Sequence, residues 1–227
     1  MTIRASIRKD WNLIENLIDE NSMVLDIGCG EGGLIKQLSE NKNIQSRGIE
    51  INGDLVRKAI SKGLNVTQGD AEYDLKNYSS GSFDCIILSQ TLQAMYNPKN
   101  VLNELLRIGG KAIVSFPNFG HWKIRVQLMF KGTMPVTENL PYAWYDTPNI
   151  HFFTLKDFQQ MCKDSNINID RSIGLTTSGK QFEINKNTFF SNLFTSEAIF
   201  LLSKRIYEPI KIKSQQKKLT SSSVIIN

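Results

Sequence analysis

The sequence has few cysteines, few histidines and no long apolar run among its 227 residues. Its three cysteines, Cys29, Cys85 and Cys162, stand far apart, so neither a disulfide framework nor a paired-cysteine metal motif is expected. There is no run of about 18 apolar residues, so we expect no membrane span. The first ten residues lack the apolar core of a secretory signal. Together these absences favour a protein of a reducing cytoplasm.

The net charge of +5 is a property of the C-terminal end of the chain. Residues 204–227 carry six basic side chains against one acidic side chain, Glu208, so the remainder is neutral overall. A short segment rich in Ser, Gln and Lys is typical of disorder. We therefore expect residues 1–205 to form a single domain and residues 206–227 to be a disordered basic tail. A nucleic-acid groove or a membrane-binding face is not expected on the body.

Apolar periodicity alternates between strand and helix through residue 116. This order predicts an α/β fold, a doubly wound and mostly parallel sheet with helices on both faces. A further helix over 154–165 and two late strands, expected to pair antiparallel, complete the fold. The predicted strands are 22–27, 45–51, 65–68, 83–89, 111–116, 167–174 and 198–203. The predicted helices of the alternating part are 3–20, 32–40, 54–62 and 98–107.

The alternation breaks over residues 117–150, which mix prolines with aromatic residues such as Trp122, Trp144 and Tyr145. A helical stretch near 121–130 is the one regular element expected there. Such an excursion beside a sheet edge is typical of a lid over a substrate or of a partner contact. The aromatic residues suit either role, because both pockets and interfaces are rich in them.

The segment from Val24 to Gly32 reads as a buried strand that runs into a glycine-rich turn and then a helix. Glycines at 28 and 30 let the backbone adopt positive φ and let a ligand approach closely. The following helix offers free N–H groups to an anionic group. In open α/β sheets, ligands bind at this carboxyl end of the strands. The turn therefore predicts a ligand site.

Two ligand classes compete for this turn. The stretch from Gly28 to Gly33 fits the G-x-G-x-x-G pattern of dinucleotide binding, which by itself is weak evidence. Glu50, at the end of the second strand, suits the ribose of either cofactor. A carboxylate inside the first strand, Asp26, disfavours a pyrophosphate and favours a cationic group. Asp70, after the third strand, can accept a hydrogen bond from an adenine amine.

The series from Val24 to Gly30, then Glu50, then Gly69-Asp70, resembles the signature of class I S-adenosylmethionine-dependent methyltransferases. The resemblance implies a seven-stranded, mostly parallel sheet with an antiparallel late strand. It also implies that Gly28, Cys29 and Gly30 approach the methionyl part of S-adenosylmethionine or S-adenosylhomocysteine. Asp26 would lie near the amino group, and Ser89, at the end of the fourth strand, near the methionyl end.

The same resemblance assigns the adenosine half of the cofactor. Glu50 would bind the ribose diol, Asp70 the adenine amine, and Ile51 and Ala71 would flank the adenine ring. Structural alternatives stand beside these roles: Asp26 as a strand-end cap, Glu50 as a solvated strand end, and Asp70 as a turn former.

A narrower resemblance lies in six segments that stand in order along the chain. They are similar to the family of the methionine biosynthesis protein MetW. That family is implied to act beside a homoserine O-acyltransferase, MetX, in methionine synthesis. The segments are 48–50, 68–71, 87–94, 113–122, 134–137 and 144–152.

Catalytic residues are not assigned by the sequence. Residues 89–94, after the fourth strand, lack the histidine that many small-molecule methyltransferases carry there. The two histidines, His121 and His151, stand in the excursion and favour structural roles over acid–base or zinc chemistry. Cys29 is interpreted as a small filler of the turn. Three functions follow: a cofactor-binding regulatory partner of the acyltransferase, a small-molecule methyltransferase, or a nicotinamide oxidoreductase that rests on the glycine pattern alone.

Overall fold

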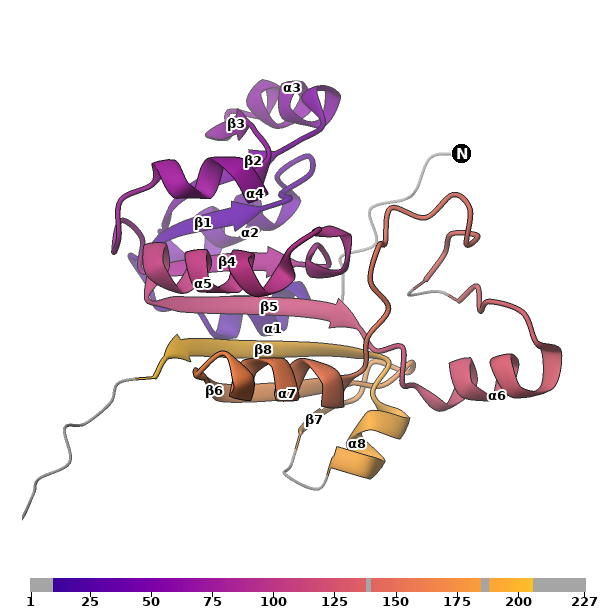
Figure 1. Cartoon of the computed structure of the whole chain (residues 1–227). Coiled ribbons are helices and arrows are strands. Elements are labelled where there is room, and N and C mark those ends of the chain that lie inside the picture. The colour runs from indigo at the N-terminus through magenta and orange to yellow at the C-terminus, as the bar shows by residue number, and fades with distance from the viewer. Residues whose placement is uncertain (1–9, 138–139, 185–187, 206–227) are drawn as a thin grey trace, which may run out of the picture.

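The computed structural model describes residues 10–137, 140–184 and 188–205, and these contain an eight-stranded sheet (Figure 1). The strand order is β3-β2-β1-β4-β5-β8-β6-β7. The first five strands are parallel, β8 is antiparallel to both β5 and β6, and β7 is antiparallel to β6. The α/β prediction and the antiparallel late pair are confirmed. The strands are β1 Met23–Ile27, β2 Gln45–Glu50, β3 Val66–Gln68, β4 Cys85–Ser89, β5 Lys111–Pro117, β6 Ile167–Leu175, β7 Gln181–Glu183 and β8 Glu197–Lys204.

The expected count of seven strands was wrong, because β7 was missed. β7 has only three residues, too few to show an alternating pattern in the sequence. It exists through its ladder with β6, where Gly174 pairs with Phe182. A Cβ on Gly174 would lie 2.8 Å from the Phe182 ring, so this glycine makes room for the aromatic side chain. This pairing depends on a chain reversal between β6 and β7, which periodicity does not reveal.

Helices cover both faces of the sheet. In Figure 1, α5 and α7 lie in front of it and α1 and α2 lie behind. The described part of the N-terminal helix is short, and residues 3–9 of the predicted helix lie outside the described residues, as does the predicted tail, 206–227. The helices are α1 Trp11–Asn16, α2 Gly33–Lys42, α3 Gly53–Ser61, α4 Ala71–Asp74, α5 Pro98–Gly109, α6 Trp122–Lys131, α7 Leu155–Asp164 and α8 Thr188–Phe194, with 3-10 turns η1 Leu75–Asn77 and η2 Leu92–Ala94.

The core explains why the central strands read as continuous apolar runs. In β4, Ile86 and Leu88 pack with α5 and α7, whereas Cys85 and Ile87 pack with α1 and α2. Successive side chains of a strand point to opposite faces, so a strand covered on both sides must be apolar at every position. All of these side chains are at most 5% exposed.

Helix starts follow the sequence signals. Thr154 caps α7, and Asp157 accepts a hydrogen bond from the Thr154 backbone N–H in return, which is a capping box. Asn97 caps α5, which begins at Pro98. These caps determine the residue at which each helix begins.

Asn118 joins the end of β5 to the following helices and is fully buried. Its amide nitrogen donates to the backbone oxygens of Asn192 and Thr195 at 2.7 and 2.8 Å. Its amide oxygen accepts from the backbone nitrogens of Gly120 and Leu155 at 3.0 and 3.2 Å. One side chain thus satisfies four backbone groups and holds three segments together at the carboxyl edge of the sheet.

The three cysteines are free and buried. Among the residues that the structure describes, no helix is long and apolar enough to cross a membrane. The arrowheads of β1, β4 and β5 point to the same edge in Figure 1, and α6 with the segment after it lies beyond that edge. This carboxyl edge carries the predicted site residues.

Candidate functional site

The glycine turn after β1 has the backbone that only glycine adopts without strain. Gly28 and Gly30 have φ values of +69° and +56°. The Gly28 N–H donates to the Ile49 carbonyl at 2.8 Å, which ties the turn to β2. A Cβ on Gly28 would lie 2.7 Å from the Thr91 hydroxyl, whereas a Cβ on Gly30 would meet nothing within 4 Å. Gly28 is therefore enclosed by the protein, and Gly30 borders open space in which a ligand can approach.

The Glu50 carboxylate at the end of β2 is the best-defined polar group beside this turn. Oε2 accepts a hydrogen bond from the Gly30 N–H at 2.9 Å, and Oε1 accepts one from the Asn52 N–H at 2.9 Å. Glu50 is 7% exposed. Two charge-assisted hydrogen bonds therefore fix the orientation of a nearly buried carboxylate.

The same carboxylate keeps capacity for two more donors. An ionised carboxylate has about four acceptor positions, and the two backbone N–H groups fill one on each oxygen. One position on each oxygen remains, which matches the two adjacent hydroxyls of a ribose. The spare acceptor positions of Glu50 therefore fit the nucleoside part of the implied cofactor, and the solvated-strand-end alternative does not account for its burial.

The residues expected around an adenine lie together at the ends of β2 and β3. The Gly69 N–H donates to the Glu50 carbonyl at 3.1 Å, so the two strand ends are adjacent. Asp70 caps α4 through Oδ1, which accepts from the Glu72 N–H at 3.0 Å. Asp70 therefore has the local structural role that was given as the alternative to adenine binding. Its Oδ2 takes no part in the hydrogen bond from Glu72. Ala71 is buried, and Ile51 is 65% exposed.

The methionyl end was expected near Asp26 and Ser89, and both are buried, at 3% and 8% exposed. Ile27 pairs with Leu88, and alternation places Asp26 and Ser89 on the same face of the sheet. Ser89 does not stand alone there. Its hydroxyl donates to Asp10 Oδ2 at 3.0 Å and lies 3.0 Å from the Ser115 hydroxyl.

Asp10 is the polar residue that sequence reasoning missed at this edge. It is 1% exposed, and its Oδ2 also accepts from Ser115 at 3.3 Å. The sequence pattern predicted one helix over 3–20, which hid Asp10 in a helix interior. The described helix begins at Trp11, directly after Asp10. An acid just before an apolar-periodic segment is a helix-start signal that could have singled it out.

Cys29 lies inside the turn as a packing residue. It is 8% exposed, and its sulfur would lie 2.5 Å from a Cβ placed on Gly48. Burial, followed by the nearby charges of Asp26 and Glu50, raises the pKa of the Cys29 thiol to about 12. The thiol therefore stays protonated near neutral pH, which is the opposite of what a nucleophile requires.

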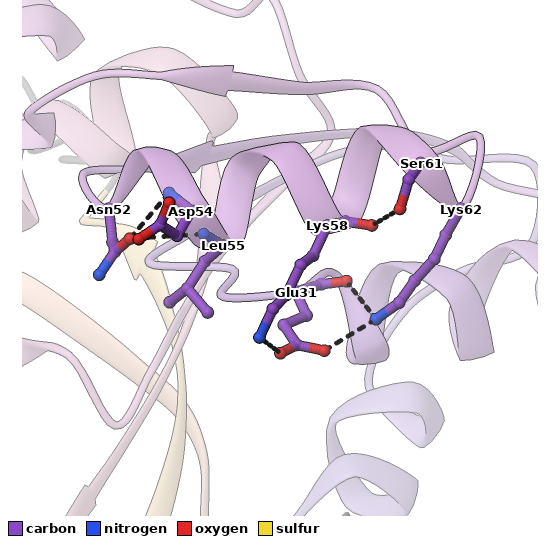
Figure 2. Close-up of polar contacts among 7 residues, drawn as sticks. All are labelled: Glu31, Asn52, Asp54, Leu55, Lys58, Ser61 and Lys62. Atoms are coloured by element: carbon purple, nitrogen blue, oxygen red, sulfur yellow. Dashed lines mark hydrogen bonds and ion pairs between the residues drawn. The ribbon is translucent and has the colours of Figure 1, made fainter.

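Two ion pairs of Glu31 connect the glycine turn to α3 and to Lys62, which directly follows α3. Glu31 binds Lys58 at 2.8 Å and Lys62 at 3.1 Å, and the Lys62 ammonium also donates to the Glu31 backbone oxygen (Figure 2). These lysine contacts lower the pKa of Glu31. The side chains are about half exposed, so these ion pairs add little stability. They connect the glycine turn to the helix that follows Glu50.

His121 lies in the excursion, and His151 follows it directly. His121 caps α6, and its Nδ1 accepts from the Lys123 N–H at 3.4 Å. Burial, and then the Lys123 charge, lower the pKa of His121. His151 Nε2 lies 3.4 Å from the Tyr96 carbonyl oxygen. The backbone N–H groups of His151 and Ile150 donate to the Gln93 carbonyl at 3.0 and 2.9 Å. These bonds attach the end of the excursion to η2, which follows β4.

No group of three metal-ligating side chains lies together among the described residues. What the carboxyl edge does bring together is a set of hydrogen-bond acceptors and close-approach glycines. Such a set can bind and orient a nucleoside and a cationic group, and it contains no activated nucleophile among the residues described above.

Comparison with known proteins identifies relatives. The family model of methionine biosynthesis protein MetW matches residues 8–202. The chain is 30% identical over 177 residues to the bifunctional methionine biosynthesis protein MetXA/MetW of Rhodopirellula baltica. That alignment covers 74% of this chain and 28% of the relative, so the chain spans less than a third of that longer protein.

Solved structures of methyltransferases share the fold. A possible histamine N-methyltransferase from Thermotoga maritima has a TM-score of 0.62 at 17% identity, over 86% of this chain and 87% of that one. An S-adenosylmethionine-dependent methyltransferase from Mesorhizobium loti also has a TM-score of 0.62, at 14% identity, over 86% and 98%. These likenesses show the class I methyltransferase fold.

Proposed function

This chain belongs to the family of methionine biosynthesis protein MetW, and on that basis we propose that it binds S-adenosylmethionine or S-adenosylhomocysteine and acts with a homoserine O-acyltransferase. The observation that carries the cofactor half is the Glu50 carboxylate, held by Gly30 and Asn52 with two acceptor positions to spare. In this proposal the Glu50 carboxylate accepts hydrogen bonds from both ribose hydroxyls. Asp70, Ile51 and Ala71 hold the adenine.

The methionyl part of the cofactor then lies along the glycine turn. Gly28 and Cys29 shape that turn, and Gly30 offers its open side. Asp26, buried on β1, supplies negative charge for the amino group, directly or through water. Ser89 borders the sulfonium end. A dinucleotide is disfavoured by the same buried acid, because its pyrophosphate is an anion.

The cofactor test is calorimetry with S-adenosylhomocysteine and, separately, with a nicotinamide dinucleotide. Saturable binding of the first alone is the expected result. Binding of the dinucleotide alone would reject the assignment and restore the oxidoreductase alternative.

The partner half of the proposal is supported by the relative from Rhodopirellula baltica, whose name unites MetXA and MetW in one chain. Two functions joined in one polypeptide elsewhere favour association of the separate proteins. We propose that association regulates acylation of homoserine and that the bound cofactor tunes it. A regulatory role of this kind needs the cofactor to bind but needs no general base beside it.

The surface proposed for the acyltransferase is the outer face of α6 together with the segment beyond it. Met129 and Phe130 are 70% and 75% exposed, and Trp144 and Tyr145 are 71% and 77% exposed. Large aromatic side chains of this kind are typical anchors of protein interfaces. Three basic residues and no acidic residue lie between 118 and 137, which suits an acidic rim on the partner.

The experiment co-expresses the full chain with its acyltransferase and measures complex formation and the acylation rate, with and without S-adenosylmethionine. Phe130→Ser is expected to abolish the complex. Ile60→Ser, which removes a 55% exposed side chain from α3, is the matched control and is expected to retain it. The partner proposal fails if the wild-type chain forms no complex and leaves the rate unchanged.

Methyl transfer to a small molecule is a second candidate, favoured by one observation. The buried Asp10 carboxylate, bound by Ser89 and Ser115, stands at the ends of β4 and β5. Attack on a sulfonium depends mainly on positioning, so a strong base is not essential. Labelled cofactor incubated with cell extract would reveal a methylated product. If the chain binds the cofactor but forms no methylated product, methyl transfer is rejected and the regulatory function is retained.

A further inference from the structure

A cavity of about 360 Å³ lies between η2, the start of α5 and the first two turns of α7. α5 and α7 both cover the front of the sheet in Figure 1, so the cavity is on that side. Its lining includes three phenylalanines, Phe152, Phe153 and Phe158. Among the described residues, neither those proposed to hold the cofactor nor those of α6 line it. A volume of this size is typical of a small-molecule site.

The aromatic wall of the cavity is partly buried and partly open. Phe158 is 1% exposed, and its ring centroid lies 4.7 Å from that of Phe116 in the core. The Phe153 ring lies at the same distance from Phe116, so both rings are held by packing. Phe152 and Ile150, in contrast, are 41% and 45% exposed. An apolar occupant would remove this exposed surface from water, which is favourable.

The one charged side chain that lines the cavity is the Asp157 carboxylate, and no lysine or arginine among the described residues lines it. Oδ2 of Asp157 accepts from the backbone N–H and the hydroxyl of Thr154 at 2.9 and 2.8 Å. Within the described part of the chain, Oδ1 accepts no hydrogen bond and the carboxylate forms no ion pair. The cavity therefore carries an uncompensated negative charge and a hydrogen-bond acceptor.

The other polar side chain of the lining, His151, adds no donor for an occupant. Its Nε2 lies 3.4 Å from the Tyr96 carbonyl oxygen. A carbonyl oxygen only accepts, so this bond places the hydrogen of the neutral ring on Nε2 and leaves Nδ1 as an acceptor. An anion would find neither a cation nor a free donor among the lining side chains, whereas a cation would find a carboxylate.

We propose that this cavity binds a small primary amine with an apolar ring as its body. The amine binds as an ammonium, which donates to Asp157 Oδ1, and the ring packs against Phe152 and Phe158. Aromatic side chains close to an ammonium add a cation–π attraction. The site depends neither on the cofactor residues at the ends of β1 to β3 nor on contact with an acyltransferase.

The test is a nuclear magnetic resonance titration of the isotope-labelled full chain with phenethylamine, at pH 7 and constant ionic strength. An alkylamine is protonated at this pH. The matched probe is 2-phenylethanol, in which a hydroxyl replaces the ammonium. We expect saturable shifts of the Leu92, Phe152 and Met161 amides with phenethylamine. Binding of 2-phenylethanol should be about fivefold weaker, because an exposed ion pair contributes up to about 1 kcal/mol.

Variants separate this site from general attraction to acidic side chains. Asp157→Asn keeps an oxygen that accepts from Thr154 and should weaken phenethylamine about fivefold while leaving 2-phenylethanol unchanged. Asp164→Asn removes the same charge from the other end of α7 and should leave both probes unchanged. Phe152→Ala should weaken both probes roughly fivefold, because part of the apolar wall is lost. Asp157→Asn remains informative if Phe152→Ala fails to fold.

Four results would each overturn the proposal. Phenethylamine does not bind, or both probes bind equally well. Asp157→Asn and Asp164→Asn weaken phenethylamine equally, or the shifted amides lie outside the cavity. Because neither probe contains adenosine, a failure here is distinct from a failure of S-adenosylhomocysteine to bind.

Discussion

Replacing Glu50 by Gln is the sharpest test of the cofactor site. The carboxylate accepts from two backbone N–H groups, at Gly30 and Asn52, both at 2.9 Å. A glutamine has one oxygen, so its NH2 group must face one of these donors. The change is isosteric, yet it turns one hydrogen bond into a donor–donor contact and removes one ribose acceptor.

The magnitude follows from the lost ribose contact. A hydrogen bond to a charged group contributes about 1.5–3 kcal/mol. The dissociation constant of S-adenosylhomocysteine should therefore rise roughly 10- to 100-fold. The unpaired backbone donor should also lower the stability of the ligand-free protein by about 1–3 kcal/mol.

The assay is isothermal calorimetry with S-adenosylhomocysteine, with circular dichroism to confirm that each variant is folded at the titration temperature. Glu31→Gln is the matched control, because Glu31 belongs to the same turn but pairs outward with Lys58 and Lys62. Its affinity should change less than about threefold, as expected for exposed ion pairs. A folded Glu50→Gln protein with wild-type affinity would refute the assignment of Glu50.

Three further predictions concern the turn, the β5 end and the thiols. Gly28→Ala and Gly30→Ala both force alanine to a positive φ, which costs about 1–2 kcal/mol of stability. Gly28→Ala should lose more, because its Cβ would also lie 2.7 Å from Thr91 Oγ1, whereas Gly30→Ala should in addition weaken cofactor binding; thermal melts and calorimetry distinguish the two, and equal melting temperatures would contradict this. Asn118→Ala should cost about 3 kcal/mol, a fall of roughly 6–12 °C in Tm, because four backbone groups lose their partner. The pKa values of the three buried thiols are raised to about 12 from the ordinary 9.0, so unfolded thiols ionise first. Stability measured by urea denaturation should then fall as pH rises above 9, and Cys29 should resist iodoacetamide at pH 8 in the folded protein; rapid alkylation would contradict its burial.

The elements with strong local signals were predictable. The predicted strand 83–89 contains β4, and the predicted helices 98–107 and 154–165 begin within a residue of α5 and α7. β7 gave no such signal, because three residues carry no period and their pairing with β6 depends on a chain reversal. The late antiparallel pair was found because β6 and β8 are long enough to show theirs.

The candidate site divides in the same way. Asp26, Gly28, Glu50 and Asp70 were predicted because each stands at or near the end of a predicted strand, and parallel strands end at one edge. Asp10 was missed, since its role depends on hydrogen bonds to Ser89 and Ser115, which lie 79 and 105 residues away.

The sequence by itself determined the class of fold, the family resemblance and the residue types at the strand ends, because periodicity and turn chemistry are local. The tertiary structure decided which atoms meet. It gave Glu50 two backbone donors and two spare acceptor positions, enclosed Gly28 while leaving Gly30 open, and buried Asp10 against Ser89 and Ser115. These properties depend on distances between segments far apart in the chain, and packing sets such distances only when the whole sheet forms.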